Sequence, residues 1–179
     1  ENGVVRNRDF FGGNLKGVIS KLPYLSSLNV TTLYLNPIFK AYSNHKYDTE
    51  DYEEIDPMFG TKEDFSTLCK EAEKYGIKIV LDGVFNHVGS SSKYFNIDKK
   101  YGEGGAYNDK NSHYRDWFYF HDDNSYDCWW SFPTLPRINA QSKGAQKYFC
   151  GANGIVPRWL KAGASGWRLD VVDEIADCL

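Results

Sequence analysis

Four stretches of the chain place apolar residues at every third or fourth position, the spacing that forms one apolar helix face. They predict helices over 14–28, 61–76, 142–162 and 173–179. Asn14 and Thr61 stand where helix N-caps are expected, and Gly76 stands where a helix C-terminal glycine is expected. Pro23 lies inside the first stretch, so this helix is expected to bend or to start in two pieces.

Three apolar runs without alternation separate these stretches, at 31–36, 77–81 and 167–172. Such runs are typical of strands that are buried on both faces of a parallel sheet. The order helix–strand–helix–strand–insert–helix–strand–helix predicts an α/β fold, in which right-handed crossovers connect parallel strands. A polar loop is expected after the first strand, with a turn at 56–60.

Residues 88–139 show neither the helical spacing nor the continuous apolar runs of the segments above. They are rich in Ser, Gly, Asn, Asp and aromatic residues. A connection of about 50 residues is too long for a plain loop, so we expect a small inserted subdomain. The alternative is a disordered linker, against which the aromatic residues argue: Trp117, Phe118, Phe120, Trp129, Trp130 and Phe132. The predicted division is 1–87 as the first part of the sheet domain, 88–139 as the insert and 140–179 as its continuation.

Aromatic residues make up 16% of the 179 residues, with 13 Tyr, 11 Phe and 5 Trp. This exceeds what a core of this size needs, so some rings are expected to form a stacking surface for flat faces such as sugars, while others pack the core. The net charge of -3 provides no basic surface for nucleic acid or anionic lipid. No apolar run reaches the roughly 18 residues of a membrane span.

Four cysteines, at 69, 128, 150 and 178, form no CxxC pair, which argues against a zinc knuckle or a thioredoxin motif. They are expected to be reduced and mostly buried, which suits a cytoplasmic protein. An extracellular location stays open, because residue 1 looks like an arbitrary cut and a signal peptide would be missed.

Candidate chemistry lies at the C-terminal ends of the strands, where α/β folds place their active sites. The three ends supply Tyr47 and Asp48, then Asp82, Asn86 and His87, then Arg168 and Asp170. Residues two apart on a strand point to the same side, so Arg168 is expected beside Asp170, where its charge favours the ionised carboxylate. An oriented carboxylate is what a glycosidase nucleophile needs, although a purely structural Arg–Asp pair is the alternative.

The segments 82–87 (DGVFNH) and 166–170 (GWRLD) resemble two signature regions of the α-amylase family, and 11–175 follows the family's order. The segments 43–49 and 135–139 look like its neopullulanase and cyclomaltodextrinase branch. The resemblance implies a retaining α-glucan hydrolase or transglycosylase acting on starch, maltodextrin or pullulan. It also implies a partial (β/α)8 TIM barrel, about strands two to four, with the insert after strand three and the first strand before residue 1.

The resemblance also implies roles for individual residues. Asp170 is the expected nucleophile, held by Arg168, while His87 hydrogen-bonds the sugar in the reacting subsite. Tyr47 is expected to stack under the same sugar ring, and Asp48 to shape the floor of the pocket.

Four further residues receive supporting roles by the same resemblance. Asp82 is expected to fix the arginine, and Asn86 to brace the loops or a calcium ion. Trp129 and Trp130 either line the glucan groove or pack the core of the insert.

Two departures from the family pattern carry expectations of their own. Asp173 and Glu174 follow the nucleophile where members usually have a His or Asn-Glu, and the missing His argues against calcium at that position; no cofactor is required. The general acid is expected beyond residue 179, so the isolated chain is expected to be inactive. Its open strand edges are expected to make it self-associate.

Three other functions are compatible with parts of this pattern. A non-catalytic amylase-like partner module need not keep Arg168, Asp170 and His87, so their presence favours an enzyme. An isomerising relative, such as a trehalose synthase, shares the first chemical steps. A phosphate-binding α/β protein is disfavoured, because no glycine-rich phosphate loop follows any strand.

Overall fold

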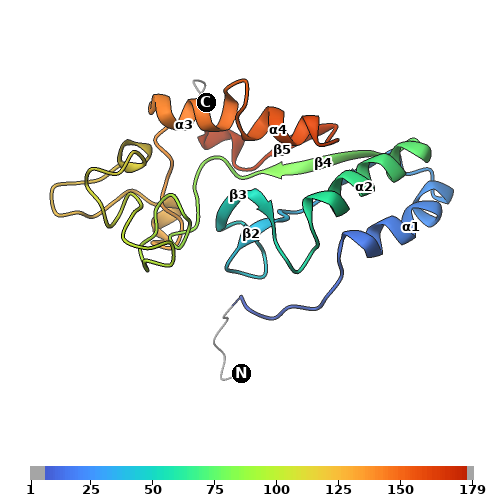
Figure 1. Cartoon of the computed structure of the whole chain (residues 1–179), viewed down its shortest axis with the longest axis horizontal. Coiled ribbons are helices and arrows are strands. Elements are labelled where there is room, and N and C mark those ends of the chain that lie inside the picture. Colours follow the sequence, from blue (N-terminus) through green and yellow to red (C-terminus); the bar gives the residue numbers. More distant parts are fainter. Residues whose placement is uncertain (1–6, 177–179) are drawn as a thin grey trace.

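The computed structural model describes residues 7–176, which are built around a three-stranded sheet (Figure 1). The strands β1 (Thr32–Tyr34), β4 (Lys78–Gly83) and β5 (Gly166–Leu169) are parallel and lie in the order β1-β4-β5. The register pairs Leu33 with Ile79, and Asp82 with Arg168. The predicted parallel α/β sheet is therefore confirmed.

Burial on both faces, predicted for all three strands, holds only for the central strand. Strand β4 is mostly buried; it has a strand on each side, and α2 packs against it. Thr32 and Tyr34 of β1 are exposed, as are Arg168 and Leu169 of β5. Within residues 7–176 each of these two strands pairs only with β4, and none of their residues is fully buried, so the prediction is wrong for both.

The first two helices begin at the predicted caps. Helix α1 (Leu15–Ser27) begins after Asn14, whose side chain accepts a hydrogen bond from the Gly17 amide at 2.8 Å. Pro23 lies inside α1, which nevertheless runs in one piece. Helix α2 (Lys62–Lys74) begins with a capping box between Thr61 and Asp64. No helix within residues 7–176 is both long and apolar enough to cross a membrane.

The single helix predicted over 142–162 is wrong, because two helices occupy this stretch. They are α3 (Lys143–Cys150) and α4 (Ile155–Lys161). Gly154 lies in the break, where an added Cβ would come within 2.5 Å of the Tyr148 carbonyl oxygen. Only glycine fits this close approach of two backbones. In Figure 1, α3 and α4 run along one side of β4.

The end of the chain also differs from the prediction. Strand β5 ends at Leu169 rather than at 172, because Val171 adopts a left-handed conformation with a φ of 44°. A 3-10 turn, η3 (Val172–Glu174), follows, and Ile175 is extended. The predicted helix over 173–179 is therefore absent up to residue 176, and its last three residues lie outside the described part of the chain.

An antiparallel hairpin replaces the polar loop that was expected after the first strand. It consists of β2 (Phe39–Ala41) and β3 (Thr49–Ile55), joined by residues 42–48. Strand β3 carries acidic residues that pair with cations far along the chain. The pairs are Glu50–Lys100, Asp51–Lys93, Glu53–Lys93 and Glu53–Arg158.

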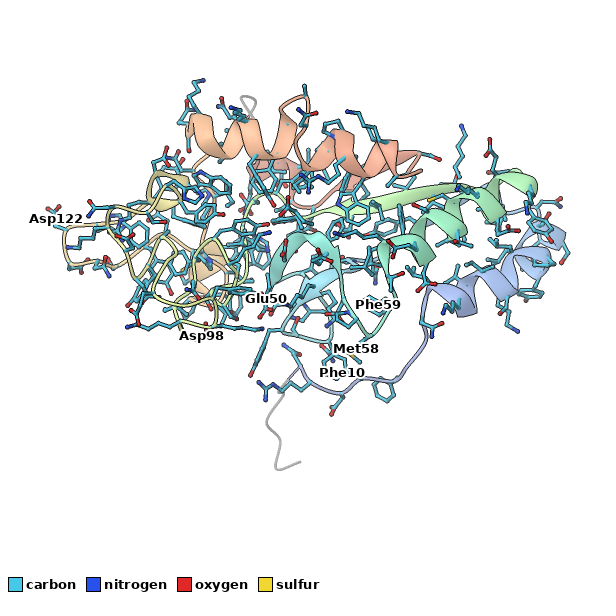
Figure 2. All side chains as sticks on the ribbon, viewed as in Figure 1. Phe10, Glu50, Met58, Phe59, Asp98 and Asp122 are labelled. Atoms are coloured by element: carbon cyan, nitrogen blue, oxygen red, sulfur yellow. The ribbon has the colours of Figure 1, made fainter. Side chains whose placement is uncertain are left out.

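The insert is folded without α-helices or named strands. It contains the 3-10 turns η1 (Arg115–Trp117) and η2 (Trp129–Ser131), and Phe95 packs on Phe118 with ring centroids 4.9 Å apart. Its two ends pair with each other, because the Val88 amide donates to the Pro136 carbonyl at 3.1 Å. A disordered linker is therefore excluded. Figure 2 shows Asp122 at the outer tip of the insert.

The cysteines are less buried than predicted. Cys69 is buried, Cys128 is half-buried and Cys150 is exposed. Burial raises the pKa of the Cys69 thiol to about 11. The prediction of mostly buried thiols is thus wrong for Cys150, and Cys178 lies outside the described residues.

Candidate active site

A cavity of about 520 Å³ opens where the C-terminal ends of β4 and β5 meet the hairpin loop and the insert. Five of the predicted site residues line it: Tyr47, Asp48, His87, Trp129 and Asp170. Asp82 and Arg168 contact residues of this wall but do not line the cavity themselves, and neither do Asn86 and Trp130.

Asp170 lies at the first position after β5, and its amide donates to the Gly83 carbonyl at 3.1 Å. The guanidinium Nη1 of Arg168 donates to Oδ1 of Asp170 at 2.7 Å. This hydrogen bond is the main reason why the pKa of Arg168 is raised above its ordinary value. The expected juxtaposition of the two side chains is thus present, and it leaves the carboxylate oriented beside the cavity.

Asp82 is the centre of a hydrogen-bond network behind the cavity. Its carboxylate accepts from Arg168 Nη1 at 3.1 Å and from the Tyr47 hydroxyl at 3.0 Å, and also from the Tyr34 hydroxyl. Burial, followed by the hydrogen bond with Asp82, raises the pKa of Tyr34, so its hydroxyl stays protonated and able to donate. A fully buried carboxylate needs such donors.

Tyr34 was missed by the sequence analysis. It is the last residue of β1, and the guanidinium of Arg168 lies 5.8 Å from its ring centre. Its position at the C-terminal end of β1 is the signal that could have identified it, because polar groups at the C-terminal ends of parallel strands gather in one place.

His87 lies in the wall of the cavity as a neutral imidazole. Burial lowers the pKa of His87 from 6.5 to about 4, because the charged form would lose its hydration. Its Nε2 is buried and makes no hydrogen bond within the described residues. The ring stacks on Trp129 with centroids 5.5 Å apart. A ring nitrogen without a partner in a cavity wall is available to a ligand hydroxyl.

Asp48 and Tyr47 lie in the hairpin loop and form hydrogen bonds with other residues of this loop. Asp48 accepts hydrogen bonds from the amide, at 3.1 Å, and the hydroxyl of Ser43. The Tyr47 amide donates to Nδ1 of His45 at 3.1 Å. Ser43 was not singled out as a site residue from the sequence, because only the loop conformation brings it to Asp48.

Trp129 and Trp130 form a row of rings beside the cavity. Their centroids are 5.2 Å apart, and Phe132 lies 6.1 Å from Trp129. Trp130 is 72% exposed, so it does not belong to the buried core of the insert. Its Nε1 donates to Glu174 Oε1 at 2.9 Å, which holds the ring against the turn after β5.

Asn86 is buried next to His87, with its amide nitrogen 3.5 Å from the imidazole Nδ1. Its carbonyl accepts the Ile138 amide at 2.8 Å, which ties the end of the insert to the end of β4. Among residues 7–176, no three His, Cys, Asp or Glu side chains form a group that could hold a metal ion. Calcium binding at Asn86 stays a prediction.

Comparison with known proteins gives related sequences over nearly the whole chain. The family described as "Alpha amylase, catalytic domain" matches residues 2–178. An amylopullulanase of Thermoanaerobacterium saccharolyticum is 46% identical over 95% of this chain and 15% of its own length. Neopullulanase 2 of Thermoactinomyces vulgaris is 40% identical over 95% of this chain and 29% of its own length. The chain thus spans less than a third of either relative.

A solved structure gives the same result for the fold. The cyclic alpha-maltosyl-(1→6)-maltose hydrolase of Arthrobacter globiformis superposes with a TM-score of 0.82 and 34% identity, over 98% of this chain and 41% of that one. The three parallel strands and their helices therefore match part of a (β/α)8 TIM barrel, as the resemblance implied. Together, the matched residues, the identity and the fold establish that the chain belongs to the α-amylase family.

Proposed function

We propose that this chain carries the nucleophile half of a retaining glycoside hydrolase that acts on α-glucans. The observation that carries the proposal is the side chain of Asp170, held by Arg168 at 2.7 Å in the wall of a cavity lined by Tyr47, His87 and Trp129. Aromatic faces and a neutral imidazole suit a sugar, which presents apolar ring faces edged by hydroxyl groups.

In the proposed reaction, a carboxylate oxygen of Asp170 attacks the anomeric carbon of the bound sugar. The bond from that carbon to the glycosidic oxygen breaks, and the leaving oxygen takes a proton from a general acid. Water then attacks the glycosyl ester, gives up a proton to the same group and releases the sugar with its configuration retained. His87 Nε2 supplies a hydrogen bond to a sugar hydroxyl, and Tyr47 supports the ring.

The general acid has to come from a carboxyl group about 5 Å from the nucleophile. The two other carboxylates nearest the cavity are engaged: Asp48 accepts from Ser43, and Asp82 from Arg168 and two tyrosines. Glu174 accepts from Trp130. We therefore propose that the acid is supplied by residues outside these 179, and that the isolated chain hydrolyses no glucan.

The substrate class rests on the relatives. They include an amylopullulanase, a maltogenic amylase, a neopullulanase and a cyclic alpha-maltosyl-(1→6)-maltose hydrolase, names that point to α-1,4- and α-1,6-linked glucans. Hydrolysis and glycosyl transfer share the covalent intermediate and differ only in whether water or a sugar hydroxyl resolves it.

Covalent trapping tests the function directly. The full-length gene product is incubated with a fluorinated α-glucosyl fluoride, which forms the ester quickly and releases it slowly, and the labelled peptide is located by mass spectrometry. The label is expected on Asp170 and is expected to be absent from Asp170→Asn. Asp173→Asn, a matched change at an exposed acid three residues on, should label normally. A label on another carboxylate would overturn the assignment.

Two simpler measurements separate the rival functions. A reducing-sugar assay of the gene product on maltodextrin and pullulan is expected to show turnover, whereas a non-catalytic partner module would show none. Chromatography of the products is expected to show shorter glucans, whereas an isomerising relative would leave the chain length unchanged and convert a disaccharide such as maltose into another disaccharide.

A further inference from the structure

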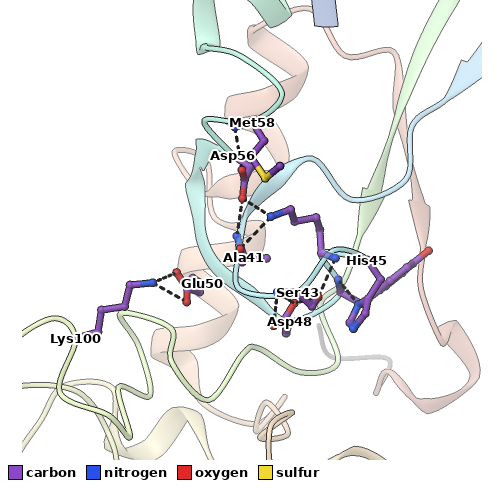
Figure 3. A network of polar contacts seen from close by, with 10 residues as sticks. Ala41, Ser43, His45, Asp48, Glu50, Asp56, Met58 and Lys100 are labelled. Atoms are coloured by element: carbon purple, nitrogen blue, oxygen red, sulfur yellow. Dashed lines mark hydrogen bonds and ion pairs between the residues drawn. The ribbon is translucent and has the colours of Figure 1, made fainter. Parts of the chain in front are cut away.

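A buried ion pair joins the hairpin loop, which borders the candidate site, to the turn that follows β3 (Figure 3). Lys46 Nζ lies 2.7 Å from Asp56 Oδ2, and the side chains are only 3% and 6% exposed. Two charges removed from water in this way are costly unless they are paired and hydrogen-bonded, so their placement calls for an explanation.

Lys46 immediately precedes Tyr47 and Asp48, and its own backbone is in a demanding conformation. Its φ is 64°, in the left-handed region that residues other than glycine rarely adopt. Its amide donates to the Ser43 hydroxyl at 3.1 Å, and its Nζ donates to the Ala41 carbonyl at 3.1 Å. A backbone in this conformation persists only where surrounding contacts stabilise it, and the contacts of the lysine side chain are among them.

Asp56 is the fixed end of the pair. Its amide donates to the Ile38 carbonyl at 2.9 Å, and its carbonyl accepts the Phe59 amide at 2.8 Å. Its carboxylate also accepts the Met58 amide at 3.0 Å. The Leu15 amide in turn donates to the Phe59 carbonyl at 2.9 Å, so Asp56 is anchored to β2 and, through the turn, to the start of α1.

Aromatic rings close the pocket around the ammonium group. Lys46 Nζ lies 5.1 Å from the centre of the Phe10 ring and 5.9 Å from that of Phe59. Figure 2 shows Phe10, Met58 and Phe59 gathered at this side of the hairpin. These contacts orient the lysine side chain away from the cavity, which its neighbours Tyr47 and Asp48 line.

From this arrangement we infer that Lys46 and Asp56 are positioning residues, whose ion pair holds the hairpin loop so that Tyr47 reaches both the sugar site and Asp82. The inference rests on the proposed function for its kinetic consequence. Neither side chain lines the cavity, so the pair acts through Tyr47 and Asp48 and not on the substrate.

Two variants of the full-length gene product separate positioning from mere stability. Lys46→Met leaves the buried Asp56 carboxylate without its cation, so both the melting temperature and kcat/KM are expected to fall. The fall in kcat/KM is expected to be about 10- to 100-fold, because the hairpin loop that carries Tyr47 shifts. Lys46→Met/Asp56→Asn removes both charges, so the melting temperature is expected to recover most of the loss. With the directed contact still absent, kcat/KM is expected to stay low.

The control is Lys62→Met, which breaks an ion pair with Glu54 at 2.8 Å whose two side chains are about half exposed to solvent. Neither its melting temperature nor its kcat/KM is expected to change measurably. If the double variant regains wild-type kcat/KM together with its melting temperature, the pair is only structural and the inference is overturned.

Hydrogen exchange gives a readout that does not need catalysis. Amides of residues 41–48 are expected to exchange faster in the double variant than in the wild type or in Lys62→Met, while amides of α2 are unchanged. Unchanged exchange of 41–48 overturns the inference. If instead exchange rises but the wild-type gene product hydrolyses no glucan, the proposed function fails and the role of the pair in holding the loop stands.

Discussion

Arg168 donates from a single guanidinium nitrogen to two carboxylates, reaching Oδ1 of Asp170 at 2.7 Å and Oδ1 of Asp82 at 3.1 Å. Asp82 belongs to β4 and Asp170 follows β5, so one cation fixes the relative position of two neighbouring strand ends. Tyr34 and Tyr47 complete this arrangement, since both hydroxyls donate to Asp82. The proposed nucleophile is therefore oriented by a network that spans three strand ends and the hairpin loop.

Replacing Arg168 with lysine is expected to disable this network. The lysine side chain is one bond shorter and ends in a compact ammonium, so it cannot place a donor where Nη1 of Arg168 contacts both carboxylates. We expect kcat of the full-length gene product to fall by about 100-fold or more, since a misplaced catalytic group is costly. Arg158→Lys is the control, because Arg158 forms a partly exposed pair with Glu53 away from the cavity. Equal activity of the two variants would contradict the role of Arg168.

His87 is expected to make the folded chain sensitive to acid. Burial holds the pKa of His87 at about 4, whereas the imidazole of the unfolded chain takes up its proton near 6.5. Between these values the unfolded state binds more protons, so stability falls as the pH falls from about 6.5 to about 4. The loss amounts to about 3 kcal/mol.

Urea unfolding at several pH values measures this loss. His87→Gln is expected to lose about 3 kcal/mol less than the wild type over the same pH range. His113→Gln, a change at an exposed histidine, should follow the wild-type curve. Parallel curves for the wild type and His87→Gln would show that the buried imidazole is not the titrating group.

Gly89 is expected to tolerate no side chain. A Cβ at this position would lie 2.5 Å from the backbone oxygen of Asp48, and the Gly89 amide donates to the Thr49 carbonyl at 2.9 Å. Gly89→Ala therefore pushes the hairpin away from the insert, at a cost of about 1–3 kcal/mol. Thermal unfolding measures the cost, and kcat/KM is expected to fall because Tyr47 and Asp48 move with the backbone.

A glycine elsewhere in the insert gives the matched control. A Cβ at Gly104 would meet no atom within 4 Å, and its φ is not positive. Gly104→Ala is expected to change stability by less than about 1 kcal/mol. A loss at Gly104 as large as at Gly89 would mean that the insert is generally intolerant of alanine and that the contact with Asp48 is not the cause.

The sheet was predictable because its signals are local. The run at 77–81 is apolar without alternation, and the cap residues Asn14 and Thr61 stand at the true helix starts. Parallel strands bring their C-terminal ends together, so topology predicts that Asp82 and Arg168 lie at one edge of the sheet, whereas their contact was implied by the family resemblance.

Some of the features that were missed depend on residues far apart in the sequence. Strand β3 carries four acidic residues in seven, which local propensity assigns to a loop. Lys93, Lys100 and Arg158 neutralise this strand from 40 or more positions away, so no local pattern reveals it. The break between α3 and α4 was missed for a different reason, since the helical spacing that continues across it outweighed the local turn signal of Gly151, Asn153 and Gly154.

The isolated chain of 179 residues is expected to self-associate. Within residues 7–176, strands β1 and β5 each pair only with β4, so one edge of each offers free backbone groups to another chain. Tyr34 and Leu169 lie on these strands and are 43% and 42% exposed, which adds apolar surface beside the free edges. Light scattering at rising concentration is expected to give a mass above that of the 20.5 kDa monomer.

Two lysine substitutions test whether the strand edges drive the association. Leu169→Lys should lower it, because a charge on an edge strand opposes pairing. Leu160→Lys should not, although Leu160 is 41% exposed, because it lies on the surface of α4. A monodisperse monomer at high concentration, or equal effects of the two lysines, would show that the sheet edges do not drive association.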